Sequence, residues 1–203
     1  MQWVAFRQLE AARRELARRD VHLGGDEPFL VAEDSADVWA NQELYRFDAT
    51  DGAPAFFVPA DEAAQRAQGE AVLEALRQDG TALVAEDLGV IPDFVRASLD
   101  ALGIPGFRVL RWEERDGRFR PPAEWPVLSV ATNGTHDTET TAVWWEQLPA
   151  HQRAAIREIP QLGAIPEDLA GAYHHHVHRA SLEILYESPS RLALLPIQDV
   201  FGL

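Results

Sequence analysis

The sequence contains no cysteine and no lysine, and its 18 basic side chains, all arginine, stand against 33 acidic ones. The absence of cysteine excludes disulfides, cysteine-ligated zinc and thiol catalysis. The formal net charge of -15 argues against binding to nucleic acid or to an anionic membrane, because both need a basic face. No apolar run approaches the roughly 20 residues that a bilayer-spanning helix needs. An uncharged partner such as a sugar fits this charge better.

The chain has 203 residues, of which 46% are hydrophobic and 25% charged, a composition typical of globular proteins. This length usually makes one domain, but a complete eight-stranded α/β barrel needs about 250 residues. The opening residues, MQWVAFRQLE, lack a basic region followed by an apolar core, so no secretory signal is expected.

Short apolar runs alternate with helical patterns along most of the chain. Helical spacing occurs at residues 3–19, 59–80, 92–104, 138–148, 150–158 and 171–188. The apolar runs are at residues 81–87, 106–112, 127–137 and 191–200. Strands that alternate with helices in this way indicate βαβ units, so the sequence predicts an α/β fold with a parallel sheet.

Acidic residues follow three of the predicted strands at the point where each strand ends. Glu86 and Asp87 close the run at 81–87, Asp137 closes the run at 127–137 after His136, and Asp199 follows LALLPI in the run at 191–200. Functional sites of parallel α/β proteins lie at the carboxyl ends of the strands, so these side chains are expected to share one rim. Paired carboxylates suit glycosidic chemistry, in which one acid protonates the leaving oxygen and another supports positive charge on the sugar. His136 could donate hydrogen bonds to sugar hydroxyls.

A structural alternative explains the same acids. Glu86 and Asp87 precede a predicted helix, and so does Asp137, and acids are favoured at helix N-termini as caps and by the helix dipole. Spacing alone leaves both interpretations open.

A histidine cluster at residues 174–178 offers a second kind of chemistry. His174 and His178 share a helical face, which is compatible with a metal-binding regulatory protein. A catalytic zinc site needs a third protein ligand and an open position, and the sequence identifies no third ligand. An exposed polar helix face is therefore the favoured interpretation, and no metal site is predicted.

Five segments resemble a known enzyme family, in the family's order. LVAEDLGVIPDFV (83–95), GIPGFRVLRW (103–112) and NGTHDTETTAVWW (133–145) are similar to segments of 4-α-glucanotransferases, the amylomaltases or disproportionating enzymes of glycoside hydrolase family 77. GGDEPFLVAEDSADVWANQELY (24–45) and RLALLPIQDVFGL (191–203) resemble an earlier segment and the last barrel strand of the same family.

The resemblance implies a fold and a set of roles. The fold would be an incomplete (β/α)8 TIM-type barrel, with residues 1–203 forming a single partial catalytic domain. Glu86 matches the general acid/base, and Asp137 matches the carboxylate that stabilises the transition state. His136 matches a histidine that binds the donor sugar, and Asp87 would bind substrate or orient the acid.

The resemblance also implies the reaction and its partners. Such enzymes cleave an α-1,4 bond, hold a glucosyl-enzyme ester and transfer the glucan to another sugar, so the product retains its configuration. The expected partners are maltooligosaccharides or α-1,4-glucan in the cytoplasm. The chemistry requires neither a metal nor an organic cofactor.

One catalytic group of the family has no counterpart in this sequence. The family's nucleophile is the aspartate of an Arg-Ile-Asp-His strand, and the interval that should contain it collapses to residues 52–56, an apparent internal deletion. Asp48, in Arg46-Phe47-Asp48, is the nearest imitation, but Ala49 replaces the histidine. The chain is therefore expected to be inactive or impaired alone. The alternatives are a non-catalytic maltodextrin-binding remnant, or one that pairs with a complementing chain.

Overall fold

The computed structural model describes residues 2–26, 61–78 and 80–203, and the chain divides into two compact units, Met1–Ala55 and Phe56–Leu203. In the first unit, helix α1 (Gln2–Arg18) confirms the predicted N-terminal helix. Asp48, the 52–56 interval and most of the segment at 24–45 lie outside the described residues. Within the described ranges, no helix combines the length and the apolar character that crossing a bilayer requires.

The second unit contains the predicted helices and strands, with shifted ends. Its helices are α3 (Glu62–Arg77), α4 (Asp93–Leu102), α5 (Thr141–Gln147), α6 (Ala150–Ile156), α7 (Pro160–Gly163), α8 (His175–Glu187) and α9 (Ile197–Phe201), with 3-10 turns η2 (Leu110–Trp112) and η3 (Pro122–Glu124). Its strands are β1 (Gly106–Val109), β2 (Glu114–Arg115), β3 (Arg118–Phe119), β4 (Ser129–Thr132) and β5 (Leu192–Ala193).

A parallel sheet with the order β1-β4-β5 forms the centre of this unit. Gly106 also forms a parallel bridge with Ala85, which places the 81–87 segment beside β1. The α/β class with a parallel sheet is therefore confirmed. The strands are shorter than the apolar runs, because the first run forms only this bridge and the last run turns into α9 after two strand residues.

The connection from β1 to β4 differs from the predicted alternation. It contains the antiparallel hairpin β2–β3 and η3 instead of an α-helix. Asp116 and Gly117 form the hairpin turn, with φ values of 51° and 76°. Positive φ at both turn positions gives the twist that a two-residue hairpin needs, and an Asp-Gly pair tolerates it.

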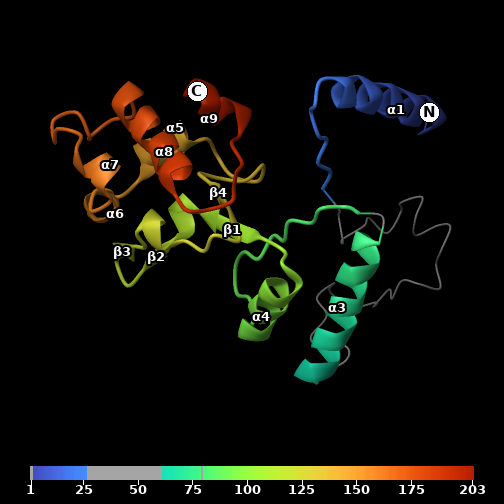
Figure 1. Ribbon diagram of the computed structural model, residues 1–203. Coiled ribbons are helices and arrows are strands. Elements are labelled where there is room, and N and C mark those ends of the chain that lie inside the picture. The colour runs from blue at the N-terminus through green and yellow to red at the C-terminus, as the bar shows by residue number, and fades with distance from the viewer. Residues whose placement is uncertain (1, 27–60, 79) are drawn as a thin grey trace, which may run out of the picture. The chain divides into compact units, whose positions relative to one another are not determined.

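The hydrophobic core lies between β4, the β1–β4 connection and helices α5 to α8, which gather on one side of the sheet (Figure 1). Every residue of β4 is buried, because β1 and β5 flank it. The largest fully buried apolar side chains are Trp145, Leu110, Ile156, Leu162, Ile184 and Leu185. Removal of these surfaces from water is the main force that fixes the helices against the sheet.

Replacement of Ile184 tests this core. Its side chain is 0% exposed in α8, so Ile184→Ala should lower the free energy of unfolding by about 2–5 kcal/mol through lost burial and a cavity. Tyr186, 68% exposed in the same helix, is the matched control, and Tyr186→Ala should have a much smaller effect. Urea unfolding followed by circular dichroism measures both, and equal losses would contradict the assigned core.

Candidate active site

The loop after β4 carries two of the predicted site residues. Thr132 ends the strand, and its hydroxyl donates a hydrogen bond of 2.6 Å to the Gly134 carbonyl. Thr138 closes the loop, because its hydroxyl donates to the Thr135 carbonyl at 2.9 Å and accepts from the Thr135 N–H at 3.1 Å. Asp137 is fixed at its backbone, where its N–H donates to the Thr135 hydroxyl at 3.3 Å. These bonds hold the loop and leave the side chains of His136 and Asp137 exposed to solvent.

His136 and Asp137 are adjacent and accessible. Their side chains are 65% and 76% exposed, and His136 Nε2 lies 3.4 Å from Asp137 Oδ2. The loop before them needs a glycine at position 134, because a Cβ on Gly134 would lie only 2.4 Å from the Thr138 hydroxyl. The loop therefore presents a carboxylate and an imidazole, the groups predicted to bind sugar hydroxyls.

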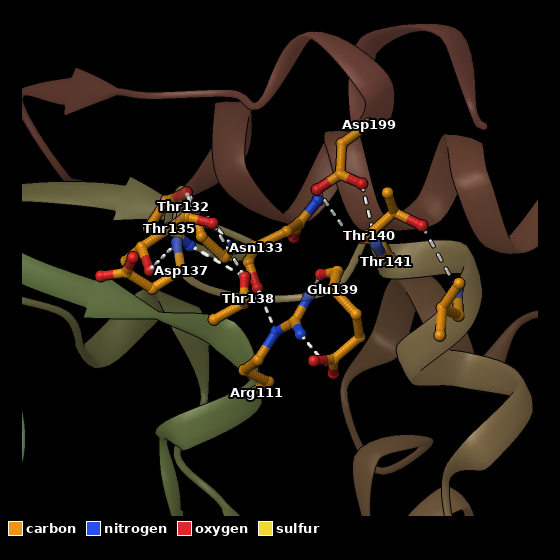
Figure 2. A network of polar contacts seen from close by, with 12 residues as sticks. Arg111, Thr132, Asn133, Thr135, Asp137, Thr138, Glu139, Thr140, Thr141 and Asp199 are labelled. Atoms are coloured by element: carbon orange, nitrogen blue, oxygen red, sulfur yellow. Dashed lines mark hydrogen bonds and ion pairs between the residues drawn. The ribbon is translucent and has the colours of Figure 1, made fainter.

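Arg111 anchors this loop from the neighbouring strand. It follows β1 in η2, and its Nε donates to the Asn133 carbonyl at 2.8 Å (Figure 2). Its Nη1 donates to Glu139 Oε1 at 2.7 Å, and its Nη2 donates to the Glu139 carbonyl at 3.1 Å. The guanidinium carbon also lies 5.1 Å from the centre of the Trp144 ring, which is cation–π distance. Burial lowers the pKa of Arg111, and the Glu139 and Asp199 carboxylates oppose this shift.

Asp199 fixes the helix that follows the loop. Its buried carboxylate accepts the Thr141 N–H and the Thr141 hydroxyl, both at 2.8 Å (Figure 2). His178 Nε2 hydrogen-bonds to the Asp199 carbonyl at 2.8 Å, which links α9 to α8. Arg111 and Asp199 thus hold the two ends of the segment that contains His136 and Asp137. The sequence predicted Asp199 among the acids at the strand ends, but it did not identify Arg111 as part of the site.

A cleft of about 360 Å³ opens beside this loop, between the ends of β4 and β5, and is named here the β4–β5 cleft. His136 lines it. The other lining residues are Gly134, Thr135, Thr138, Glu139, Thr140, Leu194, Leu195, Pro196 and Gln198. The combination of apolar and hydrogen-bonding groups is typical of a small-molecule site.

Glu86 follows the parallel bridge beside β1, one strand away from β4. It follows Ala85, which bridges to Gly106, and its side chain is exposed. Among the described residues it forms no side-chain hydrogen bond or ion pair. Glu86 and Asp137 each follow a parallel segment, with β1 between the two segments, but Glu86 lies beside the start of β1 whereas Asp137 lies beyond the end of β4. The structure does not join them by a contact.

Asp87 is buried and fully engaged, unlike Glu86. Its Oδ1 accepts the Phe107 N–H at 2.7 Å, and its Oδ2 lies 3.3 Å from Arg108 Nη1 and 3.4 Å from Arg96 Nε. Its side chain is only 2% exposed. These contacts tie the segment after Glu86 to β1 and leave the carboxylate little freedom to reach a ligand.

The capping alternative is wrong for all three acids. The N-cap of α4 is Pro92, which makes no side-chain capping bond. The N-cap of α5 is Thr140, whose hydroxyl accepts the Val143 N–H. The acids at the strand ends are therefore not explained by helix capping.

The histidine cluster is built into the start of α8. His174 is its N-cap, and Nδ1 accepts the His176 N–H at 3.1 Å. Within the part of the chain that the structure describes, no three histidine, cysteine or acidic side chains come together in a way that could hold a metal ion.

Comparison with known proteins places these residues in a family context. A family model described as 4-alpha-glucanotransferase matches residues 1–57 and 58–203. The 4-alpha-glucanotransferase of Thermus thermophilus is 27% identical over 275 residues, covering 100% of this chain and 54% of that protein. The enzyme of Chlamydia muridarum is 24% identical over 269 residues, covering 100% of this chain and 50% of that protein. The chain thus spans about half the length of the curated relatives it matches.

A solved structure with a related fold is the amylomaltase from Streptococcus agalactiae in complex with acarbose. The match has a TM-score of 0.53 and 22% identity, and it covers 66% of this chain and 26% of that one. This similarity supports the arrangement of helices around a parallel sheet.

The anchoring role of Arg111 is testable by substitution. Arg111→Gln should lower the free energy of unfolding by about 2–4 kcal/mol, because the charge-assisted hydrogen bonds to the buried Asn133 carbonyl and to the Glu139 carboxylate are lost. Amide hydrogen exchange across residues 133–139 should also become faster. Arg179, whose side chain is 79% exposed, provides the control Arg179→Gln. Unchanged exchange in the loop of the Arg111 variant would contradict the anchor.

The packing of Asp87 against β1 depends on a glycine. A Cβ at Gly106 would lie 2.4 Å from Asp87 Oδ1, so Gly106→Ala should destabilise the fold by about 1–3 kcal/mol. Gly69 lies within α3 with nothing near its Cβ position, so Gly69→Ala should stabilise by about 0.5–1 kcal/mol. Thermal unfolding of both variants measures the contrast, and a shift of the same sign in both would disprove the close approach.

Proposed function

Because the chain belongs to the 4-alpha-glucanotransferase family, glycoside hydrolase family 77, we propose that it is a partial catalytic domain that takes maltooligosaccharides or other α-1,4-glucans. The observation that carries this proposal is the exposure of Glu86 and Asp137, each of which follows a parallel segment of this unit. The uncharged substrate also suits a chain with a net charge of -15. The reaction belongs to starch, glycogen or maltodextrin metabolism in the cytoplasm.

The proposed architecture is an incomplete (β/α)8 barrel in a single domain of residues 1–203. Its support is the order of the parallel segments, which follows the order of the chain from Ala85 through β1 and β4 to β5. Apolar side chains are exposed at both edges of this sheet, with Val84 45%, Leu192 47% and Leu194 53% exposed. Open edges and exposed apolar side chains are what a barrel without all its strands would leave.

The roles follow from accessibility and hydrogen-bonding capacity. Glu86 is the general acid that protonates the glycosidic oxygen and then the base that activates the acceptor hydroxyl. Asp137 and His136 bind sugar hydroxyls and stabilise the positive charge that develops at the anomeric carbon. Asp87 acts indirectly, because its contacts to Phe107 and the two arginines hold the segment that carries Glu86.

A complete retaining cycle needs a further carboxylate. The nucleophile of such enzymes lies about 5–5.5 Å from the acid and forms the covalent glucosyl intermediate. We place its loss at the interval near residues 52–56. The family model supports this, because its match breaks between residues 57 and 58. The alignment with the Thermus thermophilus enzyme also extends over 275 residues, although this chain contributes 203.

Two forms of the protein satisfy these constraints. In one, a complementing chain supplies the missing strands and the nucleophile. In the other, the chain is a remnant that binds maltodextrin without transferring it. Both place sugar at the rim with His136 and Asp137.

Product analysis with maltotriose tests the missing nucleophile. Incubation with the purified chain should give neither glucose nor longer maltooligosaccharides, because removal of a covalent nucleophile costs many orders of magnitude in rate. The Thermus thermophilus relative is the positive control. Efficient disproportionation by this chain would show that a nucleophile is present.

Calorimetric titration with maltoheptaose tests the sugar site separately. Asp137→Ala should weaken binding about tenfold or more, because hydrogen bonds between a carboxylate and sugar hydroxyls are lost. Asp168→Ala removes an equivalent exposed carboxylate after α7 and should leave the affinity unchanged. Glu86→Gln should retain binding. Equal affinity of the wild type and the Asp137 variant would contradict the assigned rim.

A further inference from the structure

A second and larger cleft, of about 530 Å³, begins directly after Glu86 and lies between the 87–89 loop, α4, β1 and the β2–β3 hairpin. We name it the arginine cleft. Its lining residues include Arg96, Arg108, Arg115, Arg120, Trp112, Asp87 and Glu113. Glu86, His136 and Asp137 do not line it.

The charge of the arginine cleft is opposite to that of the chain. Four arginines face two carboxylates, an excess of two positive charges in a protein with a net charge of -15. Concave surfaces lined by one sign of charge focus the electrostatic field and concentrate ions of the opposite sign. A strong local reversal of charge is therefore a specific signal for an anionic ligand.

The carboxylates do not satisfy the arginines. Asp87 is shared between Arg108 and Arg96, and Arg96 Nε is buried without a hydrogen bond. Glu113 lies 3.9 Å from Arg120 Nη1, which is too far for a hydrogen bond. Burial raises the pKa of Glu113, so its surroundings disfavour the negative charge that would neutralise the cleft.

The hairpin adds an unbalanced cation. Arg115 in β2 lies directly opposite Arg118 in β3, and like charges at facing positions are destabilising. Among the described residues Arg115 forms no ion pair, whereas Arg120 donates to the Glu124 carbonyl at 2.6 Å. An anion in the cleft would give Arg115 a partner.

An exposed tryptophan, Trp112, lies beside the arginines and suggests a second chemical group in the ligand. Its side chain lines the cleft and remains 49% exposed, although it follows the buried residues Leu110 and Arg111. An exposed indole face beside a sugar-processing rim is a stacking surface for a pyranose ring. Arginines and a tryptophan together match a ligand with an anionic group attached to a sugar.

We propose that the arginine cleft binds a phosphate group, and that Trp112 favours a phosphate ester of a sugar over the free ion. Arginine is suited to this because its planar guanidinium binds phosphate oxygens through two parallel hydrogen bonds. The site does not depend on glucan transfer, because no lining residue is assigned to the chemical step. It adds a phosphorylated ligand to a rim otherwise built for uncharged glucan.

Isothermal titration calorimetry at constant ionic strength tests the proposal on the 203-residue chain. The ligands are glucose 6-phosphate, inorganic phosphate and maltose, at a pH where phosphate is mainly dianionic. Both phosphates should bind saturably, and glucose 6-phosphate should bind more tightly because its ring contacts Trp112. Tighter binding of inorganic phosphate than of glucose 6-phosphate would confirm the anion site and contradict the contact between the sugar ring and Trp112. Maltose, which carries no phosphate, should bind much more weakly, and maltose binding as tight as that of glucose 6-phosphate would overturn the phosphate site.

Three substitutions locate the ligand within the arginine cleft. Arg115→Gln should weaken glucose 6-phosphate binding about tenfold, through loss of a charge-assisted contact. Arg118→Gln removes the same charge from the same hairpin outside the cleft, so its effect should stay within about twofold. Glu113→Gln should strengthen binding, because it removes a negative charge from the cleft.

The pattern across these variants decides between a site and a diffuse attraction. Equal weakening by Arg115→Gln and Arg118→Gln would mean that only overall charge matters, and would overturn the proposal. Absence of binding by any phosphate at millimolar concentration would do the same. Loss of maltoheptaose binding would leave these titrations unaffected, so the two proposals fail independently.

Discussion

The buried guanidinium of Arg111 is the interaction on which the candidate site depends. It leaves the end of β1 and binds two carbonyls and one carboxylate in the segment after β4. A buried cation without these acceptors would be strongly destabilising, so the two strand ends must keep their relative positions for the charge to remain satisfied. Asp199 applies the same constraint from the other side, because its carboxylate is occupied by Thr141. The loop between them can then expose His136 and Asp137 without losing its shape.

The direction of the strands and the residues at their ends could be predicted from the sequence, because each depends on local pattern. Apolar runs followed by acids predicted the parallel sheet, which the structure confirms, and a shared rim of Glu86 and Asp137, which stays a prediction. The helix caps could not be assigned in this way, since three acids satisfy the general preference and the actual caps are Pro92 and Thr140. The preference for capping residues predicts that a cap lies near each helix start, but it does not select one residue among several neighbouring ones.

Long-range contacts account for the rest. Arg111 lies 22 residues from Asn133 and 28 from Glu139, and no spacing in the sequence relates them. The β2–β3 hairpin was missed because its strands have two residues each, too few to show alternation, although the Asp-Gly turn was visible. Strand length was overpredicted for a related reason. An apolar run indicates which residues are buried, not which residues form a strand. After β1 ends, the next residues in η2 are still buried, so the run is longer than the strand.

The two clefts differ in the charge of the residues that line them. The β4–β5 cleft contains His136 and the carboxylate-bearing Glu139, and its remaining polar groups are neutral, which disfavours an anion. The arginine cleft carries an excess of two positive charges. Because the chain has a net charge of -15, an anion can bind only where several cations lie close together. Salt screens the attraction of these cations beyond a short distance, so a phosphate would be confined to the arginine cleft. A phosphorylated sugar would therefore bind with its orientation fixed by charge, its phosphate away from the Asp137 carboxylate and its ring at Trp112.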